Sequence, residues 1–169
     1  KENNYKVHYY ISPHLESFEE RITLSNKKIS KQKLYDALSY VKKTNGKNPI
    51  TFFEVTTAAA FYLFSKFSAD FLILETGLGG RLDATNVIEH SIIDIITPIS
   101  LDHKEFLGSN LKKITDEKLG IIKSSSSIII GKQNWEIASH IRKNIKKNKN
   151  RKLFYDKDFK VIKTTNKHF

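Results

Sequence analysis

Short apolar runs separated by helical patterns constrain the fold of this chain most strongly. Residues 71–74 and 128–130 are unbroken apolar runs, and residues 92–97 form a further strand pattern that Pro98 ends. A short unbroken run such as residues 71–74 is typical of a central parallel strand that is covered on both faces. We therefore expect these three segments to be buried strands.

Apolar residues at helical spacing recur between the apolar runs, and further strand patterns lie at residues 6–11 and 153–155. Strands that alternate with helices predict an α/β fold with a mostly parallel sheet flanked by helices. The predicted helices are residues 30–43 after a Ser30 cap, residues 52–67, a helix capped by Asn110, and residues 135–145.

The composition narrows the class of protein. The chain has 169 residues, enough for one domain with a hydrophobic core, and its length does not require two. Its 39% apolar and 28% charged residues exclude a disordered chain and a membrane protein. Cysteine is absent, which excludes disulfides, thiolate metal sites and cysteine nucleophiles. No secretory signal follows the first residues, so we expect a soluble cytoplasmic protein that does not bind a membrane.

The chain carries a formal net charge of +11, which raises the question of nucleic-acid binding. Residues 142–152 contain seven basic residues in eleven. A nucleic-acid surface often adds aromatic side chains that stack on bases, and this run contains none. We therefore favour a solvated, basic helix end over a nucleic-acid partner.

Two polar residues follow predicted strands at positions where a parallel sheet binds ligands. Glu75 comes directly after residues 71–74, and His103 lies a few residues beyond the strand at residues 92–97. A carboxylate and an imidazole at neighbouring strand ends could share a metal with substrate phosphates. Equally, Glu75 could cap a nearby backbone turn and His103 could be a surface loop residue. The spacing alone leaves both interpretations open.

A glycine-containing loop at residues 77–81 lets backbone N–H groups approach an anion closely. The loop matches neither GxGxxG nor GxxxxGK[ST], and a tight turn after a strand would need glycines for itself. Residues 44–47 look like the tail of a phosphate loop, but no strand precedes them and Asn48-Pro49 disfavours a helix start. We interpret that segment as an ordinary Asn-Gly turn.

Residues 75–88, with the sequence ETGLGGRLDATNVI, resemble the signature of the folylpolyglutamate synthase and dihydrofolate synthase family of the Mur ligase superfamily. Other blocks match the family in the same order and spacing, so the resemblance covers residues 5 to about 160. These blocks are residues 10–15, 20–22, 51–54, 97–103, 106–108 and 117–123.

The resemblance implies an ATP-dependent ligase of folate biosynthesis that uses ATP and Mg²⁺. Such enzymes transfer the γ-phosphoryl group of ATP to a carboxylate of dihydropteroate or a folate. The amine of L-glutamate then attacks the acyl phosphate to give an amide. The family also implies a monomer when the enzyme is complete.

The resemblance also implies roles for individual residues. Glu75 and His103 would hold magnesium, and Lys118 matches a lysine that is carbamylated in the family and has a catalytic role there. A carbamate converts the lysine from a cation into an anion that can support the metal site. The remaining site residues would contact or border the pterin substrate; they are Ser12, His14, Thr51, Phe52, Phe53, Glu54, Leu82, Asp83 and Ala84.

The chain departs from the family pattern in several places. The family's phosphate loop would lie roughly twenty residues before Tyr10, and its smaller C-terminal domain would follow Phe169. We therefore expect residues 1–169 to be a partial central ligase domain that is inactive alone; the alternative is an inactive free-standing remnant of such a ligase. Leu119 stands where the family usually has alanine and could crowd the carbamate site. Ser109-Asn110 and residues 124–127 also differ from the family pattern.

Overall fold

The computed structural model describes residues 3–101, 108 and 110–162. The chain divides into two compact units, each with its own hydrophobic core. Unit 1 comprises Lys1–Leu78 and Asp83–Val87, and unit 2 comprises Gly79–Leu82 and Ile88–Phe169. The chain length did not require two such units, and the assignment of residues 1–169 to one partial ligase domain stays a prediction.

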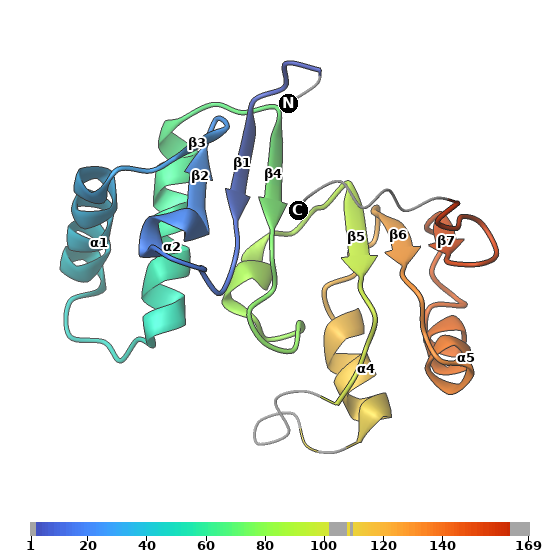
Figure 1. Cartoon of the computed structure of the whole chain (residues 1–169). Coiled ribbons are helices and arrows are strands. Elements are labelled where there is room, and N and C mark those ends of the chain that lie inside the picture. Colours follow the sequence, from blue (N-terminus) through green and yellow to red (C-terminus); the bar gives the residue numbers. More distant parts are fainter. Residues whose placement is uncertain (1–2, 102–107, 109, 163–169) are drawn as a thin grey trace. The chain divides into compact units, whose positions relative to one another are not determined.

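Unit 1 contains a mixed sheet of four strands in the order β3-β2-β1-β4 (Figure 1). Strand β1 (Val7–Tyr10) runs parallel to β4 (Phe71–Leu74), with Tyr10 opposite Leu74. Strands β2 (Ile22–Leu24) and β3 (Lys27–Lys28) extend the sheet in antiparallel fashion. The carboxyl ends of β1 and β4 therefore meet at one edge of this sheet.

Two helices complete the core of unit 1. Helix α1 (Lys31–Asn45) begins at Ser30, whose side chain accepts a hydrogen bond from the Lys33 N–H. Helix α2 (Phe52–Lys66) begins at Thr51. Small and β-branched residues let α2 pack closely in the core. The buried core residues are Tyr10, Ile22, Leu24, Ile29, Ala37, Val41, Ala59, Ala60 and Leu63.

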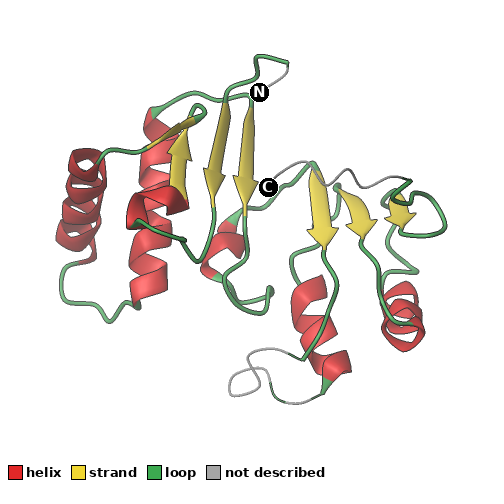
Figure 2. Cartoon of the chain, in the orientation of Figure 1, coloured by secondary structure: helices red, strands yellow, loops and turns green. Residues whose placement is uncertain are grey.

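Unit 2 contains a parallel sheet of three strands in the order β5-β6-β7, labelled in Figure 1 and drawn yellow in Figure 2. The strands are β5 (Ile93–Ile96), β6 (Ser127–Ile130) and β7 (Lys152–Phe154). Helices α4 (Leu111–Leu119) and α5 (Trp135–Asn144) supply the rest of the core. The buried core residues are Ile96, Ile99, Ile114, Ile128, Ile130, Ile137, Ile141, Ile145 and Phe154.

The α/β fold with parallel strands flanked by helices is confirmed, and each strand and helix expected from the sequence is present. The hairpin β2–β3 was not expected. Its turn, Ser25-Asn26, places both residues at positive φ (47° and 69°), a conformation that favours asparagine but is uncommon for serine. Two short 3-10 helices were also missed, η1 (Phe18–Arg21) and η2 (Ala84–Val87).

The expectation that residues 71–74 form a central strand covered on both faces is wrong. Strand β4 is an edge strand of its sheet, and Ile73 is 57% exposed. Strand β5 is also an edge strand, with Ile93 and Ile95 exposed while Asp94 and Ile96 are buried. An apolar run identifies a strand, but it does not reveal how many neighbours cover that strand.

Within the described ranges, no helix has both the length and the apolar character that crossing a membrane would require.

Candidate functional site

Glu75 lies at the carboxyl end of β4, beside the end of β1. Its backbone N–H donates to the Tyr10 carbonyl at 2.9 Å, which continues the pairing of the two strands. Its carboxylate oxygen Oε2 accepts a hydrogen bond from the Ser12 N–H at 2.6 Å. The structure thus brings two predicted site residues together, Ser12 and Glu75. This bond fits a capping role for Glu75, and the side chain is also exposed enough to bind a ligand.

The predicted partner of Glu75 in a metal site, His103, lies outside the described residues. Among residues 3–101, 108 and 110–162, no three His, Asp or Glu side chains are grouped closely enough to hold a metal. The Glu75 carboxylate is the oxygen donor type that Mg²⁺ prefers. The shared metal site of Glu75 and His103 therefore stays a prediction.

The segment that follows Ser12 is held by Glu20, which the sequence did not single out as a site residue. The Glu20 carboxylate accepts hydrogen bonds from the Leu15 N–H at 2.9 Å and the Ser17 N–H at 2.7 Å. These backbone donors, Leu15 first, lower the pKa of Glu20 to about 2. Glu20 is therefore ionised at neutral pH and connects the residues of the loop between β1 and η1 through these hydrogen bonds.

An aromatic cluster connects this loop to the start of α2. Arg21 donates from Nε to His14 Nδ1 at 2.9 Å, and its guanidinium lies over the rings of Phe18 and Phe52 at 5.2 and 6.0 Å. The Phe18 and Phe52 ring centroids are 5.6 Å apart, and Phe52 is 65% exposed. An exposed ring beside a guanidinium could hold a flat ligand that carries negative charge.

Phe18 and Arg21 were not among the predicted site residues. Arg21 lies in a block that matches the family motif, but that match assigned it no role. The cluster joins Phe52 to side chains that lie 31 to 38 residues earlier in the sequence (52 − 21 and 52 − 14), so local spacing carries no signal for that contact.

Residues 51–54 combine a helix cap with two phenylalanines. The Thr51 side chain accepts from the Glu54 N–H at 3.2 Å, and Glu54 Oε2 accepts from Thr51 N at 2.7 Å. The hydrogen bond from the Thr51 hydroxyl lowers the pKa of Glu54. Phe53 packs toward the core, with its ring centroid 5.9 Å from that of Tyr10. Thr51 and Glu54 thus have a structural use, and the exposed ring of Phe52 could contact a ligand.

Asp83 organises the first half of the glycine loop. It is 8% exposed, and its Oδ2 accepts from the Gly77 and Leu78 N–H groups at 3.0 and 2.9 Å. Its Oδ1 accepts from the Thr85 N–H at 2.9 Å and the Thr85 hydroxyl at 2.6 Å. The sequence indicated that this loop could bind an anion. In the structure, the anion bound by the Gly77 and Leu78 N–H groups is the carboxylate of Asp83.

The second half of the glycine loop belongs to unit 2 and packs on α4. The Arg81 N–H donates to the Glu117 carbonyl at 2.8 Å, and Arg81 Nη2 pairs with Glu117 Oε1 at 2.7 Å. The hydrogen bond to Glu117 raises the pKa of Arg81. A Cβ atom on Gly80 would lie 2.6 Å from the Glu117 carbonyl oxygen, and one on Gly120 would lie 2.3 Å from Arg81 Cβ. Only glycine fits at these two contacts.

Lys118 follows Glu117 near the end of α4 and is half-buried. Leu119, which could crowd a carbamate on Lys118, packs against the core of unit 2. It therefore adds apolar contact to the core. Within the segment predicted to contact substrate, Leu82 is 82% exposed and Ala84 is half-buried.

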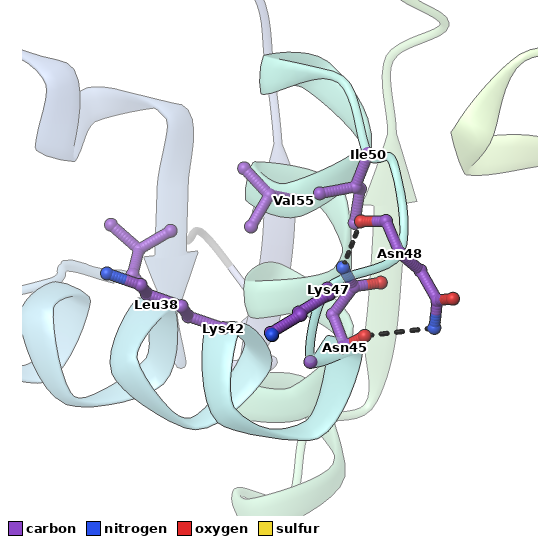
Figure 3. Close-up of a pocket in the computed structure, with 8 residues that line it drawn as sticks. Leu38, Lys42, Asn45, Lys47, Asn48, Ile50 and Val55 are labelled. Carbon is purple, nitrogen blue, oxygen red and sulfur yellow. Dashed lines mark hydrogen bonds between the residues drawn. The ribbon is translucent and has the colours of Figure 1, made fainter.

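A pocket of about 370 Å³ lies where α1 is connected to α2 (Figure 3). Its rim is the turn that superficially resembled a phosphate loop. Asn45 Nδ2 donates to the Asn48 carbonyl at 2.7 Å, and Asn48 Nδ2 donates to the Asn45 carbonyl at 2.9 Å. Gly46 has a φ of 65°. The interpretation as an Asn-Gly turn is confirmed, and no predicted site residue lines this pocket.

The basic run at the end of α5 is partly used within unit 2. The guanidinium of Arg142 lies 4.7 Å from the centroid of the Phe154 ring. Lys152 Nζ donates to the carbonyls of Asn148 and Asn150. At least two of the basic residues thus stabilise the fold locally.

Comparison with models of known protein families finds no match. The chain is 39% identical over 137 residues to a dihydrofolate synthase/folylpolyglutamate synthase of Buchnera aphidicola, covering 81% of the chain and 32% of the relative. Its structure resembles the apo form of FPGS from L. casei, with a TM-score of 0.83, 29% identity, and 94% of this chain and 40% of that one covered. It also resembles E. coli FolC in complex with DHPP and ADP, with a TM-score of 0.82, 32% identity, and 92% and 37% covered. The chain spans about a third of the length of the curated relatives that it matches.

Proposed function

We propose that this chain forms part of an ATP-dependent ligase, because it belongs to the dihydrofolate synthase/folylpolyglutamate synthase family. The reaction joins L-glutamate to dihydropteroate or to a folate. The observation that carries the proposal is the convergence in unit 1 of family segments that are far apart in the sequence. Ser12 contacts Glu75 at the carboxyl ends of β1 and β4, and His14 is connected through Arg21 to Phe52. Ligands of α/β proteins bind at such strand ends.

The proposed reaction has two steps. A carboxylate oxygen of the pterin substrate attacks the γ-phosphorus of ATP, which forms an acyl phosphate and releases ADP. The amine of L-glutamate then attacks the acyl carbon, loses a proton, and displaces phosphate to form the amide. Both steps depend on the alignment of reacting groups and on the neutralisation of phosphate charge.

Two residues are proposed to hold magnesium, Glu75 and His103. Mg²⁺ supplies positive charge beside the phosphates, and Glu75 offers it a carboxylate oxygen. Ser12 supports this arrangement because its N–H bond to Oε2 restricts the Glu75 side chain. The Glu75 side chain can then be aimed before any ligand binds.

The pterin substrate is proposed to lie against the exposed Phe52 ring. The other proposed contacts come from residues of the same segment, from the loop after β1, and from the second half of the signature. They are Ser12, His14, Thr51, Phe53, Glu54, Leu82, Asp83 and Ala84. The Arg21 guanidinium, held over the aromatic rings, would favour the negative charge of a carboxylate-bearing substrate.

Lys118 is proposed to act as a carbamate. Reaction of its neutral amine with CO₂ forms an N–C bond, releases a proton, and converts a cation into an anion. In an enzyme that contains this segment, Lys118→Ala should abolish turnover and leave the fold intact. Short carboxylic acids should partly restore turnover by occupying the anion position. Near-normal turnover of Lys118→Ala would remove Lys118 from the mechanism.

We further propose that the ligase acts in the cytoplasm as a monomer and binds neither nucleic acid nor membranes. The alternative function is an inactive remnant of such a ligase. A chimera separates the two proposals. Residues 1–169 replace the matching segment of the E. coli relative, and glutamate-dependent ADP release is measured with dihydropteroate.

We expect turnover from the chimera, no turnover from residues 1–169 alone, and loss of turnover in a Glu75→Gln chimera. A folded chimera that releases no ADP would favour the remnant. Glutamate-dependent ADP release by residues 1–169 alone would overturn the expectation that this segment is inactive.

A further inference from the structure

We infer that Gln133 is a positioning residue of the proposed reaction. Its side-chain amide clamps the backbone of residues 97–99, where the segment that leads to His103 begins. The inference deepens the proposed function and rests on it, because His103 is proposed there to hold magnesium. Gln133 lies outside the motif blocks that match the family, and all the contacts that carry the inference lie within unit 2.

The first argument is the pair of hydrogen bonds that the amide makes. Gln133 Oε1 accepts from the Ile99 N–H at 3.0 Å, and Gln133 Nε2 donates to the Thr97 carbonyl at 2.8 Å. A backbone N–H can only donate and a backbone carbonyl can only accept, so these partners fix which way the amide is turned. Both ends of one amide therefore hold a single stretch of three residues.

The second argument is that the clamp begins where strand pairing stops. Strand β5 pairs with β6 as far as Ile96 opposite Ile130, and the Gly131 N–H then donates to the Ile96 carbonyl at 2.8 Å. Pro98 has no backbone N–H, so it cannot donate to a further bond of the ladder. The Gln133 side chain, instead of the β6 backbone, bonds the residues on either side of Pro98.

The third argument is that the backbone on both sides of Gln133 is itself anchored. Before it, a Cβ atom on Gly131 would lie 3.2 Å from the Ile96 carbonyl oxygen, so the two backbones approach closely. After it, Asn134 caps α5, and its Oδ1 accepts from the Ile137 N–H at 2.8 Å. A side chain on an anchored backbone can place its partners precisely.

The fourth argument is the direction in which the clamped segment continues. Ile99 is 9% exposed and belongs to the core of unit 2, so core packing and the clamp fix it together. His103 follows four residues later (103 − 99). The clamp thus fixes the point from which the chain runs to the proposed metal ligand. Such a point matters because Mg²⁺ demands near-ideal octahedral geometry from its ligands.

Three variants separate the clamp from side-chain packing. Gln133→Met keeps nearly the same side-chain length and removes both hydrogen bonds. Gln133→Glu keeps an acceptor for the Ile99 N–H and loses the donor to the Thr97 carbonyl. Lys132→Met is the matched control, because it introduces the same residue at the neighbouring, exposed position.

The first measurement is amide hydrogen exchange in the 169-residue chain, which does not depend on the proposed function. We expect the Ile99 amide to exchange about tenfold faster or more in Gln133→Met, because its acceptor is lost. Gln133→Glu should return the Ile99 rate toward the original, and Lys132→Met should not change it. The Gly131 amide should keep its rate in all three variants, which shows that the sheet is intact. An unchanged Ile99 rate in a folded Gln133→Met would overturn the inference.

The second measurement tests the positioning role in the chimera with the E. coli relative. It is the Mg²⁺ concentration that gives half-maximal glutamate-dependent ADP release. We expect Gln133→Met to raise this concentration about tenfold, with part of the lost rate recovered at saturating Mg²⁺, and Lys132→Met to leave it unchanged. A merely structural clamp predicts a lower melting temperature with unchanged Mg²⁺ dependence, and that result would overturn the inference.

The outcomes distinguish failure of the inference from failure of the proposed function. A folded chimera with the original Gln133 that releases no ADP would count against the proposed function and against any positioning role in it. An active chimera whose Mg²⁺ dependence does not respond to Gln133→Met would count against the inference alone.

If Gln133→Met does not fold, Gln133→Asn replaces it, because the shorter amide cannot reach Thr97 and Ile99 together. Faster Ile99 exchange and a raised Mg²⁺ requirement in Gln133→Asn would support the inference. The original value of either quantity would overturn it.

Discussion

The two halves of the glycine signature are each held by a carboxylate, but in different physical settings. In unit 1, Asp83 is buried and accepts hydrogen bonds from the uncharged Gly77, Leu78 and Thr85 donors of its own loop. In unit 2, the half-buried Glu117, whose side chain is 29% exposed, pairs with Arg81, whose side chain is 59% exposed. Buried bonds to a charged acceptor are costly to break, whereas exposed ion pairs contribute little net free energy. Two carboxylates in the same signature therefore contribute differently to stability, because their surroundings differ.

The largest expected effect comes from removing the buried anchor. Asp83→Ala should lower the free energy of unfolding by about 3 kcal/mol, because buried N–H groups lose a charged acceptor. Urea unfolding monitored by circular dichroism measures the change. Glu117→Ala is the matched comparison and should cost much less. Equal losses for the two variants would contradict the distinction between the halves.

The second-largest effect is expected at Gly80, in the half of the glycine signature that belongs to unit 2. Gly80→Ala should lower the free energy of unfolding by about 2 kcal/mol, because its Cβ would lie 2.6 Å from the backbone oxygen of Glu117. Gly131→Ala is the control, because its Cβ would lie 3.2 Å from the nearest atom, the Ile96 carbonyl oxygen. If Gly80→Ala loses less free energy of unfolding than Gly131→Ala, the close approach of the Gly80 and Glu117 backbones does not stabilise the unit 2 half of the signature.

These two anchors also mark the limit of what the sequence could predict. The caps at Ser30 and Asn110 could be predicted because each bonds an N–H two or three residues away. Asp83 bonds Gly77 and Leu78 only because the loop folds back on itself, and the residue pattern does not specify that shape. The pairing of Arg81 with Glu117 joins residues 36 apart, beyond any local signal.

The same limit applies to the candidate site. The motif blocks indicated which segments belong together, and the structure joins Ser12 to Glu75. The cluster of Phe18, Arg21 and Phe52 needed the tertiary structure, because its members come from two distant segments. Burial of β4 could not be predicted from its apolar run, because burial depends on the position of the strand within its sheet.

A smaller effect is expected when the charge of Glu117 is removed. Glu117→Gln keeps the side-chain shape but removes the charge that pairs with Arg81. The melting temperature should fall slightly at low salt, and the difference from the original chain should shrink at 1 M salt because screening weakens exposed pairs. Asp83→Asn should lose stability at both salt concentrations. If the melting temperature of Glu117→Gln falls equally at low salt and at 1 M salt, Glu117 stabilises the fold in the same salt-independent way as Asp83.

The smallest effect is expected at Glu20. A comparison of Glu20 with Asp83 distinguishes two causes of stabilisation by a carboxylate, its backbone N–H donors and its burial. Like Asp83, Glu20 accepts backbone N–H groups, yet its segment is only partly buried. The backbone bonds from Leu15 and Ser17 hold the pKa of Glu20 at about 2 in the folded chain, against roughly 4.3 for an unperturbed glutamate.

Because folding lowers this pKa, Glu20 stabilises the folded state fully above pH of about 4.3, and this contribution is lost as the pH falls toward about 2. Glu20→Gln should therefore melt at a slightly lower temperature than the original chain at pH 7 and at the same temperature near pH 2. Glu16→Gln, which leaves the Leu15 and Ser17 bonds intact, should show no such convergence. A melting difference for Glu20→Gln that stays constant from pH 7 to pH 2 would mean that the ionised carboxylate does not hold this loop. Burial, rather than the backbone donors, would then explain why Asp83 is the stronger anchor.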